Sequence, residues 1–288
     1  MNTQIHIPVL LDQVIDYLKP APGKRYIDAT LGGAGHTKAL LDQGAEVLGI
    51  DQDKDVLSFV NRTLNHPLLT VVEANFMTIK TQADKYEFVA TDGVLFDLGV
   101  SSLQFDKPER GFSFMHTAPL DMRMNQGSLN TAKDLINNSS EDELYEILVN
   151  NAQEPKARAI AKQIVAHRPL STTTDLANIV LEVYGGRRGH LHPATQTFQA
   201  IRIAVNQELK ILKPALKDAF NLLKPEGRLC VISFHEGEDR IVKRTFIELV
   251  ENGLAKILTK NPVTPTSEEI NINPRARSAK LRVIERQS

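Results

Sequence analysis

The segment Asp28-Ala-Thr-Leu-Gly-Gly-Ala-Gly-His36 places three glycines between two residues that can carry charge. A glycine-rich turn after a strand lets the backbone approach a ligand closely, and an acid after the next strand can bind ribose hydroxyls. Asp51 occupies that second position. Dinucleotide sites and S-adenosylmethionine sites both follow this plan, and in a purely structural interpretation the glycines only close a tight turn.

Two residues favour S-adenosylmethionine over a dinucleotide. A dinucleotide fingerprint that begins at Gly33 and Gly35 requires a third glycine at position 38, where this chain has Lys38. The Asp28 carboxylate would repel a pyrophosphate but suits the cationic end of S-adenosylmethionine. The chain also offers no plausible Tyr-Lys pair for an NAD-dependent oxidoreductase, so that reaction is the weaker alternative.

The run Asp97-Leu-Gly-Val-Ser-Ser102 follows an expected strand, at the edge where doubly wound sheets place ligands and chemistry. An acceptor at Asp97 can hold one N–H of an exocyclic amine, such as that of cytosine, and aim its lone pair at an activated methyl group. Positioning and electrostatics would then supply the rate without a metal. The alternative is that Asp97 only caps a loop.

Other candidates lie outside these two motifs. Phe76 follows the third expected strand, where it can flank an adenine ring or simply belong to the core. Basic residues that can bind RNA phosphates, or equally form a solvated face, are Arg187, Arg188, Arg275, Arg277, Lys280 and Arg282. No metal site is expected, because the histidines at 190, 192 and 235 form no short ligand-spaced cluster with a carboxylate.

The elements that must position these side chains alternate between helix and strand. Helices are expected at 9–18, 37–43, 53–64, 193–209 and 238–250, and strands at 26–29, 47–50, 69–73, 93–96, 229–233, 255–259 and 280–285. Short buried strands separated by helices predict a parallel, doubly wound α/β sheet.

Residues 103–192 have a different character, because no convincing strand is found among them. Ser140 and Glu143 have the spacing of a capping box, Pro169 ends a helical repeat, and Thr174 opens a further helix. We therefore expect a core made of residues 1–102 and 193–288, interrupted by a helical domain at 103–192.

The composition sets outer limits on the function. The chain is 42% hydrophobic and 24% charged with net charge −1, which excludes wholesale disorder and a strongly basic nucleic-acid-binding protein. One cysteine, Cys230, excludes an intramolecular disulfide. No signal peptide and no run of roughly 20 apolar residues is found, so we expect a cytoplasmic protein without a membrane partner.

Long segments resemble the ribosomal RNA small subunit methyltransferase H family almost end to end. The most specific are 97–102, Arg110-Gly-Phe-Ser-Phe114, Pro119-Leu-Asp-Met-Arg-Met124 and 273–282. The resemblance implies a Rossmann-like class I methyltransferase that uses S-adenosyl-L-methionine, releases S-adenosyl-L-homocysteine, and methylates the exocyclic N4 of a cytidine in 16S ribosomal RNA of the small subunit. By position, it implies cofactor contacts at Ala34, Gly35, His36, Asp51, Phe76, Asp97 and Gln104.

The same resemblance makes Asp97 the candidate catalytic residue and 103–192 an RNA-recognition domain. Ser101, Ser102 and His235 are candidates for orienting a base that is unpaired or extruded from its stack. Two departures stand out, Ala34 for the usual glycine and Glu236-Gly237 for the usual Ser-Leu. A non-catalytic RNA-binding assembly factor on the same fold is the main alternative, and both monomer and homodimer stay open.

Overall fold

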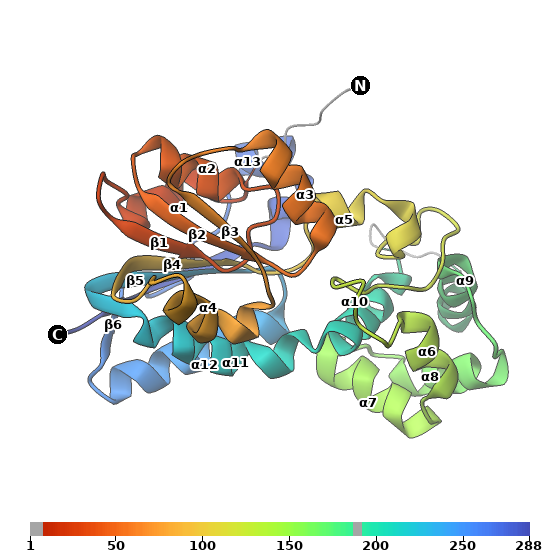
Figure 1. Ribbon diagram of the computed structural model, residues 1–288. Coiled ribbons are helices and arrows are strands. Elements are labelled where there is room, and N and C mark those ends of the chain that lie inside the picture. The colour runs from red at the N-terminus through yellow and green to blue at the C-terminus, as the bar shows by residue number, and fades with distance from the viewer. Residues whose placement is uncertain (1–7, 187–191) are drawn as a thin grey trace. The chain divides into compact units, whose positions relative to one another are not determined.

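The computed structural model describes residues 8–186 and 192–288, which form two compact units (Figure 1). The first unit joins the chain up to residue 102 with 211–288, and the second contains 103–210. Within the described residues, no helix is long and apolar enough to span a bilayer.

The first unit is built on a seven-stranded sheet in the order β3-β2-β1-β4-β5-β7-β6. Its strands are β1 (Arg25–Asp28), β2 (Glu46–Asp51), β3 (Leu69–Glu73), β4 (Thr91–Asp97), β5 (Leu223–Ser233), β6 (Ala255–Ile257) and β7 (Lys280–Arg286). Strands β1 to β5 are parallel, as expected, but β7 runs antiparallel between β5 and β6. The sheet is therefore mixed, because β7 follows an irregular connection rather than a crossover helix.

Helices cover both faces of this sheet, which makes it doubly wound (Figure 1). One face carries α1 (Leu11–Leu18), α2 (Gly35–Asp42) and α3 (Lys54–Thr63), and the other carries α4 (Ile79–Lys85), α11 (Glu208–Asn221) and α12 (Glu236–Glu251). The remaining elements of this unit are the 3-10 turns η1 (Phe76–Thr78) and η3 (Pro274–Ser278) and the short helix α13 (Ser267–Ile272).

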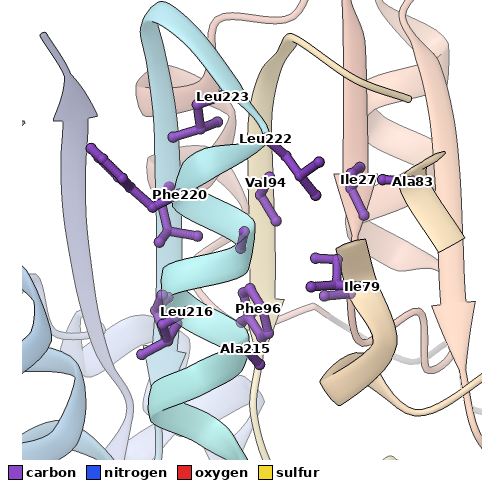
Figure 2. Close-up of a cluster of buried hydrophobic side chains, with 14 of the residues drawn as sticks. Ile27, Ile79, Ala83, Val94, Phe96, Ala215, Leu216, Phe220, Leu222 and Leu223 are labelled. Carbon is purple, nitrogen blue, oxygen red and sulfur yellow. The ribbon is translucent and has the colours of Figure 1, made fainter. Parts of the chain in front are cut away.

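The two faces follow from the alternation of side chains along each strand. In β1, Tyr26 packs in the cluster under α1 and α2, whereas Ile27 packs in the cluster under α4, α11 and α12. Figure 2 shows the second cluster, where Val94 and Phe96 of β4 lie against α11. This packing fixes the carboxyl ends of the parallel strands at one edge of the sheet.

The second unit is helical in its described part, apart from an isolated bridge between Pro119 and Thr172. It contains most of α5 (Ser102–Phe105), then η2 (Pro108–Arg110), α6 (Ala132–Asn138), α7 (Glu141–Ala152), α8 (Ala157–Ala166), α9 (Thr173–Tyr184) and α10 (Ala194–Asn206). The capping box expected at Ser140 and Glu143 is present, with Ser140 Oγ accepting from the Glu143 amide at 3.2 Å.

The second unit extends beyond the boundary expected at residue 192. Helix α10 packs on α6, α7 and α9, so the division falls at residue 210. The single helix expected over 193–209 is also two helices, because Gln207 adopts a left-handed conformation with φ 52° and ends α10. The apolar spacing continues across this break, so the sequence pattern does not predict where α10 ends.

Candidate functional site

Three acids predicted from the sequence end neighbouring strands of the sheet. Asp28 is the last residue of β1, Asp51 of β2 and Asp97 of β4. Because these strands are parallel and paired with one another, their carboxyl ends and the loops that follow lie at one edge. The fold therefore brings the acids together as the sequence predicts.

Asp28 organises the glycine loop from inside the protein. Its side chain is almost fully buried, and Oδ2 accepts a hydrogen bond from the Thr37 hydroxyl at 2.7 Å while Oδ1 accepts one from the Thr30 amide at 3.2 Å. Burial raises the pKa of Asp28 to about 6. These contacts tie the end of β1 to the start of α2.

Asp51 faces the glycine loop from the neighbouring strand. Its Oδ2 accepts from the Gly32 amide at 2.9 Å, and its Oδ1 accepts from the Asp53 amide at 2.9 Å. The residue as a whole is partly exposed. Burial of its carboxyl group raises the pKa of Asp51 to about 6. A carboxylate oxygen can accept more than one hydrogen bond, so both oxygens of Asp51 can still accept from hydroxyl groups.

Asp97 is the most perturbed acid at this edge. Its Oδ1 is buried and has no hydrogen-bond partner among the described residues, and its amide donates to the Thr30 hydroxyl at 2.6 Å. Burial, with added repulsion from Asp28 and Glu238, raises the pKa of Asp97 to about 8. A buried carboxylate oxygen that accepts no hydrogen bond from the described residues does not behave as a loop cap. It marks a position where a cation or an N–H donor is favoured.

His36 lies beside this carboxylate in the first turn of α2. The ring is 5% exposed, with Nε2 2.9 Å from the Val9 carbonyl oxygen and Nδ1 3.7 Å from Oδ2 of Asp97. Sequence reasoning placed His36 at the cofactor on resemblance alone. Its contact with Asp97 was missed, because no spacing rule relates a residue in the first loop to the end of β4.

Phe76 lies in η1, directly after β3. Its ring packs edge to face on Phe96, with centroids 5.7 Å apart and planes at 75°, and it remains only partly buried. Asn75 precedes it, caps η1 and donates to Gln52 Oε1 at 2.7 Å. The loops after β2 and β3 are thus tied together, and Phe76 has both a core contact and exposed ring surface.

The loops after β4 and β5 also reach this edge. A Cβ placed on Gly32 would lie 3.8 Å from the Ser101 Cβ, and one placed on Gly99 would lie 3.8 Å from the Phe234 ring. His235 accepts from the Glu238 amide at 3.4 Å and caps α12, with Nε2 3.1 Å from Oε1 of Glu238.

Two of the predicted site residues lie at or beyond the division between the units. Ser102 begins α5, and Gln104 is buried in that helix as part of the second unit.

A family model described as the MraW methylase family matches residues 3–287. The chain belongs to this family. Ribosomal RNA small subunit methyltransferase H from Halothermothrix orenii is 45% identical over 306 residues, covering 98% of each chain. The protein of that name from Deinococcus deserti is 46% identical over 285 residues, covering 98% of this chain and 93% of the relative. The resemblance found in the sequence is therefore confirmed.

Solved structures show a weaker likeness. An rRNA methylase from Streptococcus thermophilus has a TM-score of 0.47 and 11% identity, covering 98% of this chain and 99% of that one. The Rossmann-like methyltransferase fold expected from the sequence agrees with family membership and with the doubly wound sheet.

Ala34, where the resemblance implies a glycine, adopts a backbone conformation that favours glycine. Ala34 caps α2 in the left-handed region, with φ 60°, which a residue with a Cβ adopts at a cost of about 1–2 kcal/mol. Its methyl group is buried with Leu31, Leu57 and Val60, which offsets part of that cost. The neighbouring Gly35 is more constrained, because a Cβ there would lie 3.0 Å from the Pro8 ring.

The second departure from the family pattern, Glu236-Gly237, changes the surroundings of the basic segment. Oε1 of Glu236 accepts from Lys280 Nζ at 2.6 Å, and Asp239 accepts from Arg282 at 2.6 and 3.1 Å. Lys280 and Arg282 were expected to face RNA phosphates, but they pair with acids in the first turn of α12. The reversed direction of β7, which sets Lys280 opposite Ser233, causes this pairing and is invisible in the sequence.

The other candidate RNA contacts divide into two groups. Arg275 and Arg277 are exposed in η3, as their proposed role requires. Arg187 and Arg188 lie outside the described residues.

In the part of the chain that the structure describes, no group of three or more His, Cys, Asp or Glu side chains is arranged to hold a metal ion.

The raised pKa of Asp97 predicts how stability depends on pH. Because the unfolded pKa is about 4 and the folded pKa is about 8, the unfolded chain loses this proton first, and folding becomes less favourable as pH rises between these values. We expect the ligand-free Asp97→Asn variant to gain stability over the wild type from pH 5 to pH 8.5. Urea denaturation at both pH values measures this gain, with Asp84→Asn on the exposed surface of α4 as the control. An equal difference at both values would mean that Asp97 titrates normally.

Proposed function

We propose that this protein transfers a methyl group from S-adenosylmethionine to the exocyclic N4 amine of a cytidine in 16S ribosomal RNA of the small subunit, in the cytoplasm. Family membership and the names of the relatives support the reaction class and the RNA substrate. The observation that carries the proposal is the buried Oδ1 of Asp97, which has no hydrogen-bond partner among the described residues.

The residues at the sheet edge fit the cofactor. When bound, S-adenosylmethionine supplies a methyl group already activated by its sulfonium. Asp51 offers carboxylate oxygens to the ribose hydroxyls, and Phe76 offers exposed ring surface to the adenine. The acids Asp28, Asp97 and Glu238 repel one another's charge, so a cation among them relieves that repulsion. The glycine loop lets the protein backbone approach the ligand closely.

Asp97 has the central catalytic role in this proposal. The amine of cytosine is a poor nucleophile, because its lone pair is delocalised into the ring. By accepting one N–H, the Asp97 carboxylate favours pyramidal nitrogen and directs the lone pair at the methyl carbon. The base must be unpaired or extruded to reach this position. Ser101 and Ser102 follow Asp97 closely enough to orient the base, and His235 supports the same region by capping α12.

We further propose that the helical unit recognises RNA together with the exposed arginines of η3. The domain expected over 103–192 then extends to residue 210, because α10 packs within it. Phosphate contacts of this kind position a substrate without reading its sequence. Lys280 and Arg282 pair with Glu236 and Asp239, so a phosphate must compete with these acids for them.

The exposed pair gives a testable expectation. We expect Arg275→Ala combined with Arg277→Ala to weaken RNA binding and to reduce the slope of log affinity against log salt by about two, roughly one per lost phosphate contact. Affinity for S-adenosylmethionine should not change. A matched control removes two exposed lysines of α4, Lys80 and Lys85. RNA affinity measured across a salt series decides the question, because equal slopes in wild type and variant would make η3 an ordinary solvated surface.

Incubation with methyl-labelled S-adenosylmethionine and small-subunit RNA tests the proposed function. We expect label in the RNA and none in a reaction that lacks the protein. A non-catalytic assembly factor would bind RNA without transferring label. A calorimetric titration with S-adenosylmethionine and with NADH distinguishes the methyltransferase from the oxidoreductase alternative. The oxidoreductase requires binding of NADH.

A further inference from the structure

His36 makes a different contact with each nitrogen of its ring. Nε2 lies 2.9 Å from the Val9 carbonyl oxygen, and because a carbonyl can only accept, Nε2 carries a hydrogen. In the neutral ring, Nδ1 therefore has a lone pair, and this atom is 3.7 Å from Oδ2 of Asp97. That separation exceeds a hydrogen bond in the ligand-free protein, but catalytic contacts of this kind commonly tighten in the complex.

Among the described residues, two further acids lie close enough to Asp97 to repel its charge. Asp28 comes from β1 and directs its oxygens to Thr30 and Thr37, which keeps it engaged with the glycine loop. Glu238 comes from α12, where Oε2 accepts from the Phe234 amide at 2.8 Å and Oε1 lies beside His235. His36 differs from these acids because it can accept a proton on Nδ1, which lies 3.7 Å from Oδ2 of Asp97.

We propose that Asp97 and His36 titrate as a coupled pair, and that the proton released by the methylated amine passes through the ionised Asp97 carboxylate to the unprotonated Nδ1 of His36. The second half of this inference rests on the proposed function. As the nitrogen–carbon bond forms, the carbon–sulfur bond breaks and its electron pair stays on sulfur. The cationic nitrogen gives one proton to the Asp97 carboxylate, which passes it to Nδ1. The resulting imidazolium loses it to water once the products leave.

The coupling between His36 and Asp97 is measured without cofactor or RNA. In protein with isotope-labelled histidine, NMR follows the His36 ring through a pH titration, and the His36→Gln variant identifies its signals. We expect Asp97→Asn to lower the apparent pKa of His36 by more than about one unit, because the nearby carboxylate stabilises the imidazolium. The same His36 titration in both proteins would overturn the proposal.

The relay is measured by the pH dependence of single-turnover methyl transfer at saturating cofactor. His36→Gln keeps a donor in reach of the Val9 carbonyl but has no titratable nitrogen. We expect its rate to fall by about tenfold or more and its pH profile to change shape. Lys38→Gln is the matched control, because Lys38 lies in the same turn of α2 but is exposed and pairs with Asp42. A wild-type pH profile in His36→Gln, or an equal change in Lys38→Gln, would overturn the relay.

The two measurements also separate this inference from the proposed function. If the wild-type protein transferred no methyl group to RNA, the proposed function would fail, and the NMR titration would still decide whether His36 and Asp97 titrate as a coupled pair.

Discussion

Asp97→Asn is expected to lower the single-turnover rate of methyl transfer by about two to three orders of magnitude, which is the effect of losing a group that acts directly on the reacting atoms. Asparagine keeps the size of the side chain but removes its negative charge, so its amide oxygen accepts the amine N–H more weakly and cannot take the proton. Because Asp97 also lies at the proposed cofactor site, rates must be compared at saturating S-adenosylmethionine.

Asp53→Asn is the matched control for this rate measurement. Asp53 lies at the same edge of the sheet and caps α3 by accepting from the Asp55 amide at 2.9 Å. Asparagine caps helices about as well as aspartate, so this variant should transfer methyl at close to the wild-type rate. A wild-type rate in a folded Asp97→Asn variant would remove Asp97 from the chemistry.

Asp51→Ala is expected to weaken binding of S-adenosylmethionine by about 2–3 kcal/mol, because two charge-assisted hydrogen bonds to the ribose are lost. The dissociation constant should rise by roughly 30- to 150-fold. The structure adds a second consequence, since the Gly32 and Asp53 amides also lose their acceptor. The variant should therefore be less stable as well, and thermal unfolding must accompany the calorimetric titration.

Glu73→Ala provides the comparison for Asp51→Ala. Glu73 pairs with Asp51 in the register of β2 and β3, but its carboxylate lies at the surface, 3.6 Å from Lys54. Its removal should leave cofactor affinity unchanged. Unaltered affinity in a folded Asp51→Ala variant would show that Asp51 does not bind the ribose.

The convergence of the acids was predictable from the sequence because it depends on simple regularities. Short apolar strands separated by helices predict parallel pairing, and parallel strands end at a common edge. An acid at the end of each strand, as with Asp28, Asp51 and Asp97, must then lie at that edge. The N-cap at Asp53 and the capping box at Ser140 were likewise predictable, because each depends on residues close in the chain.

Features that depend on long-range geometry were not predictable in the same way. The reversed β7 places Lys280 against Glu236, and no local pattern reveals a strand's direction. The break at Gln207 interrupts a helix whose apolar spacing continues, so the unit boundary moved to residue 210. The approach of His36 to Asp97 depends on how the first loop folds over the end of β4.

The central claim is that the methyl group goes to the N4 atom of a cytidine in small-subunit RNA. Nucleoside analysis by mass spectrometry, after reaction of unmethylated small-subunit RNA with isotope-labelled S-adenosylmethionine, tests it most directly. We predict labelled N4-methylcytidine with the wild-type protein and a severely reduced amount with Asp97→Asn in the same reaction time. Label on any other nucleoside or atom, or no label in the RNA at all, would contradict this assignment.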